Sequence, residues 1–153
     1  MAWEIEYTDE FGIWWATLTE IEQEDVDAYV QRLEARGPNL PYPHSSGING
    51  SRHDHMRELR VQSHGNPFRV FYAFDPRRTA ILLIGGDKTG NDRFYEEMIP
   101  VADALYDQHI DALKALAAQV IVLHHLVSYG PIARAAHEAL PWLAGAMHQY
   151  GRM

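Results

Sequence analysis

The fold is decided by residues 56–90, which read MRELRVQSHGNPFRVFYAFDPRRTAILLIGGDKTG. Apolar and polar residues alternate in this stretch with the period of two that is typical of β-strands. The alternating runs lie at 56–62, 68–74 and 79–85. Segments of turn-forming composition separate them at 63–66 and 75–78. Because short turns join antiparallel neighbours, the stretch predicts three antiparallel strands.

The preceding residues predict one strand and two helices. Alternation at 3–7 favours a half-exposed strand, and apolar residues from Phe11 to Leu18 recur at helical spacing. The sequence TEIE at 19–22 has the form of a capping box, in which Thr and Glu side chains satisfy free backbone N–H groups. The second helix is expected to end at Gly37, because glycine tolerates the left-handed conformation of a helix cap.

The segments on either side of the sheet predict a loop and a helical tail. Residues 39–51 are rich in Pro, Gly and Ser and predict a long loop. A helix is expected from about Asn91, kinked or restarted at Pro100, since proline lacks the N–H that a helix interior uses. A break at Gly130-Pro131 precedes a last expected helix at 132–149. The order β-α-α-β-β-β-α with a helical tail indicates an α+β fold.

Composition bounds the class of protein. The 153 residues fit one domain with an appendage, and 46% apolar residues suffice for a core. The absence of cysteine excludes disulfides and thiolate metal sites. The acidic N-terminus does not resemble a signal peptide, and no run of about 18 apolar residues occurs. These features favour a cytoplasmic protein without a membrane span.

The net charge of −8 is unevenly distributed. Residues 1–50 hold ten acidic and two basic residues, a net charge of −8, and residues 94–153 hold six and three, a net charge of −3. Residues 51–93 hold eight basic and five acidic residues, a net charge of +3. This basic stretch favours an anionic partner such as RNA, and the alternative is a solvated sheet edge.

Two arginines are predicted to face each other across the first hairpin. If Val61 lies opposite Phe68, then Arg60 and Arg69 are cross-strand neighbours on the face away from the apolar residues of the strand. Like charges in such positions destabilise a sheet. The pair therefore suits a polyanion, or carboxylates of a partner, that supplies negative charge. The alternative is that Glu58 neutralises one arginine locally.

The glycine-rich loop at 84–90 brings Lys88 to the rim of the predicted sheet. It lacks the spacing of a nucleotide-binding phosphate loop and follows an antiparallel strand, so an NTPase function is excluded. Arg93, Phe94 and Tyr95 enter the next helix, and aromatic rings beside cations are typical of single-stranded RNA recognition. The alternative is that these rings pack the helix on the sheet.

Histidines of the basic stretch bear on two kinds of chemistry, metal binding and proton transfer. His53 and His55 are two residues apart, but spacing places no third ligand, so no metal site is predicted. Because histidine side chains titrate near neutrality, His53 and His64 are candidates for acid–base chemistry.

Several motifs of this sequence resemble the phage-derived, HigB-like branch of the RelE/ParE toxin superfamily. The motifs are SRH at 51–53, MRELRV at 56–61, FRVFYAFDPRR at 68–78, LLIGGDKTG at 82–90, FY at 94–95 and IPVAD at 99–103. The resemblance runs from about Trp3 to His109. It implies a RelE-like toxin domain at 1–109, an antiparallel sheet flanked by helices, and leaves 110–153 as a helical extension of unknown role.

The resemblance also implies a function and partners. Such toxins cleave mRNA, usually on the ribosome, and a helix-turn-helix antitoxin of the HigA type neutralises them. The implied reaction is attack of an RNA 2′-OH on the adjacent phosphate, without a metal or another cofactor. Two alternatives stay open: a ParE-like gyrase inhibitor, and a catalytically inactive adaptor that binds an antitoxin or RNA.

Roles of individual residues follow from the same resemblance. Arg60 and Arg69 resemble the sheet residues that bind and stabilise the phosphate, Lys88 resembles the base after the last strand, and Tyr95 the aromatic residue that closes the site. The general base is not assigned, because Arg57 and Arg60 are three residues apart where RelE has two lysines two apart. The remaining residues assigned to RNA binding are Arg52, His53, Arg57 and Arg93.

Overall fold

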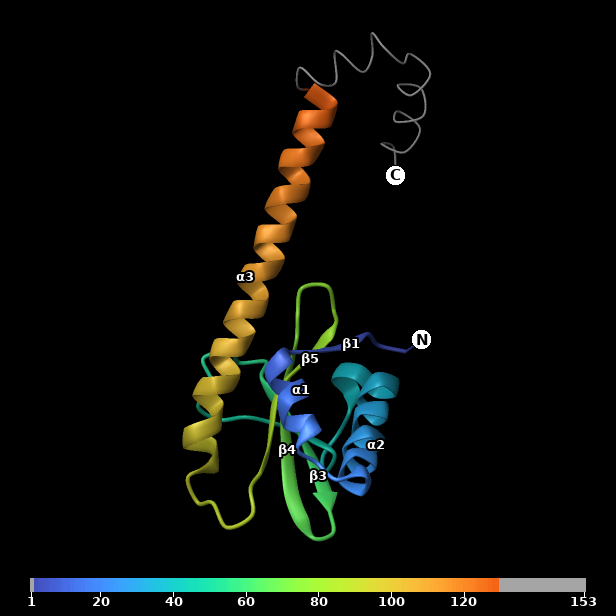
Figure 1. Ribbon diagram of the computed structural model, residues 1–153, viewed down its shortest axis with the longest axis vertical. Helices are drawn as coiled ribbons and strands as arrows, with labels where there is room; N and C mark the ends of the chain where they lie inside the picture. The colour runs from blue at the N-terminus through green and yellow to red at the C-terminus, as the bar shows by residue number, and fades with distance from the viewer. Residues whose placement is uncertain (1, 130–153) are drawn as a thin grey trace. The chain divides into compact units, whose positions relative to one another are not determined.

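The computed structural model describes residues 2–129, which form an α+β fold (Figure 1). The elements are β1 Ile5–Tyr7, α1 Asp9–Ala16, α2 Glu20–Arg36, the 3-10 helix η1 Gly37–Asn39, β2 Ser45–Gly47, β3 Arg57–Ser63, β4 Asn66–Phe74, β5 Ala80–Asp87 and α3 Phe94–Tyr129. The chain divides into two compact units, Met1–Ile110 and Asp111–Met153. The α+β class predicted from the sequence is confirmed.

The first unit holds a five-stranded sheet in the order β1-β5-β4-β3-β2. β1 pairs in parallel with β5, and all other neighbouring strands pair antiparallel. The turn between β3 and β4 has positive φ at both residues of His64-Gly65, as two-residue hairpin turns require. The resulting register pairs Val61 with Phe68 and Arg60 with Arg69, which confirms the cross-strand prediction.

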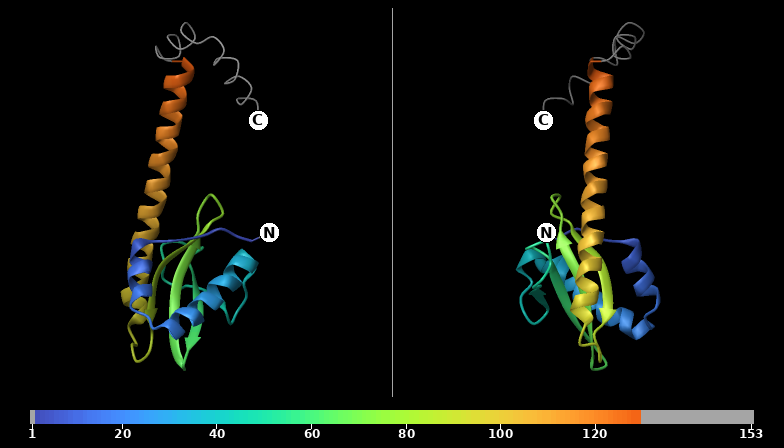
Figure 2. Two further views of the ribbon diagram at one scale, coloured as in Figure 1. Left: turned by 45° about the vertical axis from the view of Figure 1, so that its right-hand side comes forward. Right: turned by 90° about the vertical axis from the view of Figure 1, so that its left-hand side faces the viewer.

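Helices of the first unit cover both faces of the sheet. Leu59 and Val70 pack with Leu33 of α2 in one apolar core, on what we call the α1/α2 face. Phe71, which points the other way, packs with Ala102 of α3 in a second core, on the α3 face. The right-hand view of Figure 2 shows the first turns of α3, the part that belongs to the first unit, in front of the strands. Each strand of the centre therefore contributes alternate residues to two separate cores.

Short-range hydrogen bonds fix the helix ends. Thr19 and Glu22 form the predicted capping box at the start of α2. Gly37 ends α2 with φ of 56°, and a Cβ at this position would lie 2.4 Å from the Trp3 indole, so only glycine fits. Thr8 caps α1 and also donates a hydrogen bond of 2.6 Å to a carbonyl of β5. The bond from Thr8 holds the start of α1 to the sheet.

Two sequence predictions about irregular segments are corrected. The expected loop at 39–51 contains β2, whose residues pair with the start of β3. Its sequence, SSG, has no apolar alternation, so backbone pairing alone makes it a strand. α3 begins at Phe94 and runs through Pro100 without restarting. Because Pro100 has no N–H, the carbonyl of Glu96 lacks the donor that a helix normally supplies. Both residues are exposed, so water can reach that carbonyl.

The second unit is described over residues 111–129 of α3. Several of its large apolar side chains are exposed: Leu116, Val120, Ile121, Val122, Leu123 and Leu126. The predicted break at Gly130-Pro131 and the predicted helix at 132–149 lie outside the described residues. Within residues 2–129, no helix combines the length and the apolar character needed to cross a membrane.

Candidate active site

Two arginines face each other on the α3 face of the sheet. Arg60 of β3 lies opposite Arg69 of β4, and Arg69 in turn pairs with Gly86 of β5. A Cβ on Gly86 would lie 2.8 Å from the ring of Phe94, so the missing side chain lets α3 begin directly above the strand. This close packing brings the next residue, Tyr95, within hydrogen-bond distance of a β3 side chain.

Glu58 connects the members of this cluster. It lies two residues before Arg60 on β3, and its Oε1 accepts a hydrogen bond of 3.1 Å from Arg60 Nη1. The same oxygen accepts from Tyr95 Oη at 3.1 Å and from Ser46 Oγ at 3.0 Å. Arg69 Nε lies 3.8 Å from it. The alternative that Glu58 neutralises an arginine locally is confirmed, because its carboxylate forms ion pairs with both.

The centre of the cluster is withdrawn from water and incompletely hydrogen-bonded. The side chains of Glu58 and Arg69 are each 4% exposed, whereas that of Arg60 is 28% exposed. Within the described part of the chain, Glu58 Oε2 and Arg69 Nε have no hydrogen-bond partner. Leaving such groups buried and unpaired costs about 1–3 kcal/mol each, or more when they are charged. The cluster can therefore accept one further hydrogen bond and donate another.

Tyr95 and Lys88 form the outer part of the cluster. Lys88 Nζ lies 5.1 Å from the centroid of the Tyr95 ring, a cation–π contact. Burial raises the pKa of Tyr95, and Glu58 adds to this effect, while Arg69 opposes it. The protonated hydroxyl of Tyr95 donates to Glu58. The structure thus brings together the four residues that were predicted to be catalytic: Arg60, Arg69, Lys88 and Tyr95.

Arg52 and His53, which were predicted to bind RNA, lie elsewhere. Both pair with Asp107 of α3, His53 through Nε2 at 2.9 Å, and Arg52 Nε also lies 3.7 Å from Asp103. These aspartates follow Tyr95 by eight and twelve residues, which is about 12 and 18 Å along a helix. The structure uses Arg52 and His53 to tie the segment before β3 to α3.

Arg57 and Arg93 also stand apart from the cluster. Arg57 Nε donates to Ser45 Oγ at 3.1 Å, and strand alternation places Arg57 on the α1/α2 face, opposite Glu58. Arg93 is exposed and pairs with Glu96 at 3.1 Å on the first turn of α3. Their use in RNA binding stays a prediction, and the structure does not gather them around Glu58.

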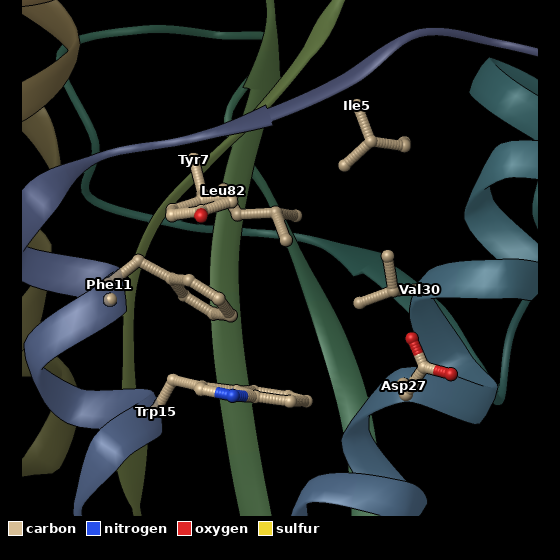
Figure 3. Close-up of a pocket in the computed structure, with 8 residues that line it drawn as sticks. Ile5, Tyr7, Phe11, Trp15, Asp27, Val30 and Leu82 are labelled. Atoms are coloured by element: carbon tan, nitrogen blue, oxygen red, sulfur yellow. The ribbon is translucent and has the colours of Figure 1, made fainter.

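A pocket of about 480 Å³ lies on the α1/α2 face (Figure 3). Figure 3 shows Phe11 and Trp15 of α1 on one side of it and Val30 and Asp27 of α2 on the other. Among the residues that line this pocket there is no lysine, arginine or histidine to meet a phosphate. Phosphate chemistry is therefore better supported by the Glu58 cluster, which lies on the α3 face.

Sequence reasoning missed Glu58 as the centre of the cluster and missed its neighbour Tyr42. Strand alternation was a signal for Glu58, since residues two apart on a strand share a face. Tyr42 had no such signal, because it belongs to the segment between η1 and β2. The Arg60 guanidinium lies 5.3 Å from the centroid of its ring.

No metal centre accompanies the cluster in the part of the chain that the structure describes. Within residues 2–129, no group of three or more His, Asp or Glu side chains is arranged to hold a metal ion. The cluster itself offers two guanidinium groups, an ammonium, a phenol and a carboxylate. These groups can bind an anion, stabilise developing negative charge and accept a proton.

Comparison with known proteins gives close relatives by sequence. The family described as phage-derived protein Gp49-like matches residues 13–107. The Mycobacterium tuberculosis protein named "Putative toxin HigB3" is 42% identical over 91 residues, which cover 59% of this chain and 78% of HigB3. "Putative toxin HigB2" of the same organism is 41% identical over 87 residues, which cover 56% of this chain and 43% of HigB2. The chain thus spans less than half of HigB2.

Solved structures overlap with the chain at lower similarity. The structure of the free E. coli toxin RelE, with two arginines replaced by alanine, aligns with 64% of this chain and with 96% of the RelE chain. The two sequences are 11% identical, and the TM-score is 0.48. The RelE–RelB complex of Pyrococcus horikoshii aligns with 59% of this chain and with 99% of the matched chain, at 11% identity and a TM-score of 0.44. The family match spans well over half of the sequence, and HigB3 is matched over most of its length. The chain therefore belongs to the phage-derived Gp49-like family, with relatives named HigB, as its motifs predicted.

Proposed function

We propose that this protein is the toxin of a type II toxin–antitoxin pair and that it acts as an endoribonuclease on mRNA. Two relatives that bear the name of HigB toxins, at 41% and 42% identity, support the toxin assignment. One observation carries the enzymatic part of the proposal. It is the gathering of two arginines and a tyrosine around one buried carboxylate on the α3 face, with a lysine over the ring of that tyrosine.

The proposed reaction is attack of a ribose 2′-OH on the adjacent phosphate, and it uses side chains only. The transition state carries extra negative charge on the phosphate oxygens. Arg60 and Arg69 stabilise that charge, because guanidinium donors held in place do not have to reorganise during the reaction. Lys88 adds a mobile positive charge at the rim. Tyr95, a half-buried neutral phenol, stacks on a base or positions the ribose.

The proposed partners are an antitoxin and the translating ribosome. The solved complexes of RelE with RelB illustrate how such toxins are held, and we propose a helix-turn-helix antitoxin of the HigA type for this chain. Charge supports an RNA substrate only locally, since the positive excess is confined to residues 51–93. RNA affinity should therefore fall with salt, with a log–log slope of about −2 for three phosphate contacts to single-stranded RNA.

A second candidate function is that of an inactive binding module. The observation that favours it is the ion pairing of Glu58 with both arginines, which neutralises part of the charge that a phosphate would meet. Induced expression of the full chain, followed by mapping of mRNA 5′ ends, separates the two. New 5′ ends within coding regions are expected from the enzyme. Growth arrest with intact mRNA would instead indicate a gyrase inhibitor or a binding module.

A further inference from the structure

We propose that Glu58 is the proton acceptor for the ribose 2′-OH in this site. The inference rests on the proposed ribonuclease function and adds the residue that the resemblance left unassigned. Glu58 is the carboxylate at the centre of the four predicted catalytic side chains, and Oε1 alone satisfies Arg60, Tyr95 and Ser46. Its other oxygen, Oε2, is left with an empty acceptor position.

The two unsatisfied atoms of the cluster match the two groups that meet at a scissile ribonucleotide. Glu58 Oε2 requires a hydrogen-bond donor, and a 2′-OH is a donor. Arg69 Nε requires an acceptor, and a non-bridging phosphate oxygen is an acceptor. In RNA the 2′-OH and the phosphate are attached to neighbouring carbons of one ribose. A single ribonucleotide can therefore satisfy both atoms at once, whereas DNA lacks the donor.

The proton and electron balance is complete with residues of this chain. Glu58 Oε2 takes the 2′-OH proton while the 2′-oxygen forms a bond to phosphorus. The bond from phosphorus to the 5′-oxygen breaks, and its electron pair stays on the 5′-oxygen, which takes a proton from the Lys88 ammonium. The products are a 2′,3′-cyclic phosphate and a 5′-OH. Glu58 then releases its proton to water, and Lys88 regains one.

Access to Glu58 requires movement of Tyr95. Oε2 and the Arg69 Nε are buried, and the Tyr95 hydroxyl donates a hydrogen bond to the other oxygen of the same carboxylate, Oε1. Tyr95 is only half-buried, and the side chain that contacts its outer face is Lys88. RNA phosphate attracts Lys88 and allows the Tyr95 ring to move off Glu58. The groups that face Glu58 from every packed element are thus Arg60, Arg69, Tyr95 and Ser46, with Lys88 beyond Tyr95.

The test compares Glu58→Gln with the exposed control Glu24→Gln in a cleavage assay on a short RNA. Gln keeps the shape and an acceptor at Oε1 but cannot take a proton. The expected result is a fall in kcat of about 10²- to 10⁴-fold with KM within threefold. The decrease in wild-type rate at acidic pH should disappear in Glu58→Gln and persist in Glu24→Gln. An unchanged kcat in Glu58→Gln overturns the assignment alone, whereas a wild type that cleaves no RNA overturns the proposed function with it.

A substrate variant keeps the test decisive if Glu58→Gln does not fold. RNA whose scissile 5′-oxygen is replaced by sulfur has a leaving group that needs no proton, so its cleavage reports the acceptor alone. With this substrate the wild-type rate should rise with pH and then reach a plateau. Lys88→Ala should regain most of its lost activity on it. A rate that rises tenfold per pH unit up to pH 9 would make hydroxide the acceptor and overturn the role of Glu58.

A separate observation points to a nucleobase subsite at Tyr42. We infer that this ring stacks on a base next to the scissile phosphate. Tyr42 is 71% exposed, and the guanidinium of Arg60 lies over its ring at 5.3 Å. Arg60 thereby spans the distance between the exposed ring and Glu58. Stacking on an aromatic ring beside an arginine is the usual way to hold a base of single-stranded RNA.

Hydrogen bonds and a ring contact hold the segment that carries Tyr42 beside β3. The backbone N–H groups of His44 and Ser45 both donate to the carbonyl of Pro41 at 3.1 Å. The N–H of Arg60 donates to the carbonyl of His44 at 2.9 Å, and the His44 ring packs edge-on against a tyrosine of α2. A platform fixed in this way loses little conformational freedom when a base stacks on it.

Tyr7 provides a matched control for Tyr42. It is 68% exposed and lies on β1, the strand at the opposite edge of the sheet from β2. With a 2′-O-methyl RNA that binds but is not cleaved, Tyr42→Ala should weaken binding about 5- to 100-fold, and Tyr42→Phe should retain it. Tyr7→Ala should bind as the wild type does. Equal affinity of Tyr42→Ala and the wild type, or equal losses in both alanine variants, would overturn the subsite.

Discussion

The two faces of the sheet carry opposite chemistry on the same strands. On the α1/α2 face, Leu59 and Val61 of β3 are fully buried in an apolar core. On the α3 face, Arg60 lies between these two residues in the sequence and forms an ion pair with Glu58, which precedes Leu59. Because side chains of a strand alternate, a seven-residue strand contributes both to stability and to the candidate site.

This difference teaches where a change should affect the fold and where it should affect activity. The α1/α2 face gains free energy from buried apolar area, and its pocket presents no cation. The α3 face accepts two buried polar atoms without hydrogen-bond partners within the described residues, an arrangement that lowers stability. Such a cost is typical of a site that is completed by its ligand.

The largest expected effect is a loss of stability from the α1/α2 face. Leu33→Ala removes a fully buried side chain of α2 and should lower the free energy of unfolding by about 2–5 kcal/mol. Cleavage per folded molecule should stay within threefold of the wild type, because Leu33 contacts none of the charged cluster. Urea unfolding followed by circular dichroism measures the first quantity. A variant that is stable but inactive would break the division between the two faces.

A comparable effect on activity is expected from the α3 face. Arg69→Gln removes a charged donor and should reduce the cleavage rate by about 10²- to 10³-fold. Because Arg69 is buried and paired with Glu58, its removal also costs stability. The exposed Arg36→Ala variant of α2 is the control and should cleave normally. Equal activity of both variants would remove Arg69 from the site.

A smaller effect on chemistry is expected from removing the second unit. A chain that ends at Ile110 retains both faces of the sheet, so its cleavage rate should stay within about threefold of the full chain. The exposed apolar residues at 116–126 are lost, and we expect the oligomeric state or the solubility to change. Light scattering and the RNA assay measure the two properties. A well-behaved but inactive truncated chain would show that the tail contributes to the site.

The smallest expected effect concerns a charge network of the first unit that lies outside the candidate site. Burial by itself raises the pKa of Asp75, but hydrogen bonds from His109 and Arg77 outweigh this and hold the pKa of Asp75 below its ordinary value. These bonds therefore stabilise the folded protein fully above about pH 4, which is the pKa of an aspartate in the unfolded chain. The stabilisation is lost as the pH falls through the lower pKa that Asp75 has in the folded chain. Asp75→Asn should lower Tm at pH 7 and flatten the decrease of Tm below pH 4. An unchanged Tm profile would contradict this role.

The sequence by itself determined every element of the sheet except β2, and one decisive register. Period-two alternation and turn composition predicted β3, β4 and β5, and the capping box predicted the start of α2, because these signals arise from residues close together in the chain. The two-residue turn at His64-Gly65 fixes the pairing of Arg60 with Arg69 for the same reason. The family could also be predicted, since its motifs are local strings of residues.

Only the tertiary structure decided what surrounds the arginine pair. Ser46 reaches Glu58 because β2 adds to the sheet edge, and Tyr95 reaches it because Gly86 admits α3. Arg52 belongs to one motif of the basic stretch, SRH at 51–53, yet aspartates of α3 far along the chain engage it instead. Formal charge in a sequence does not report which opposite charge will lie beside it. That is set by packing between distant segments, which buries Glu58 with both arginines and leaves Tyr42 exposed next to them.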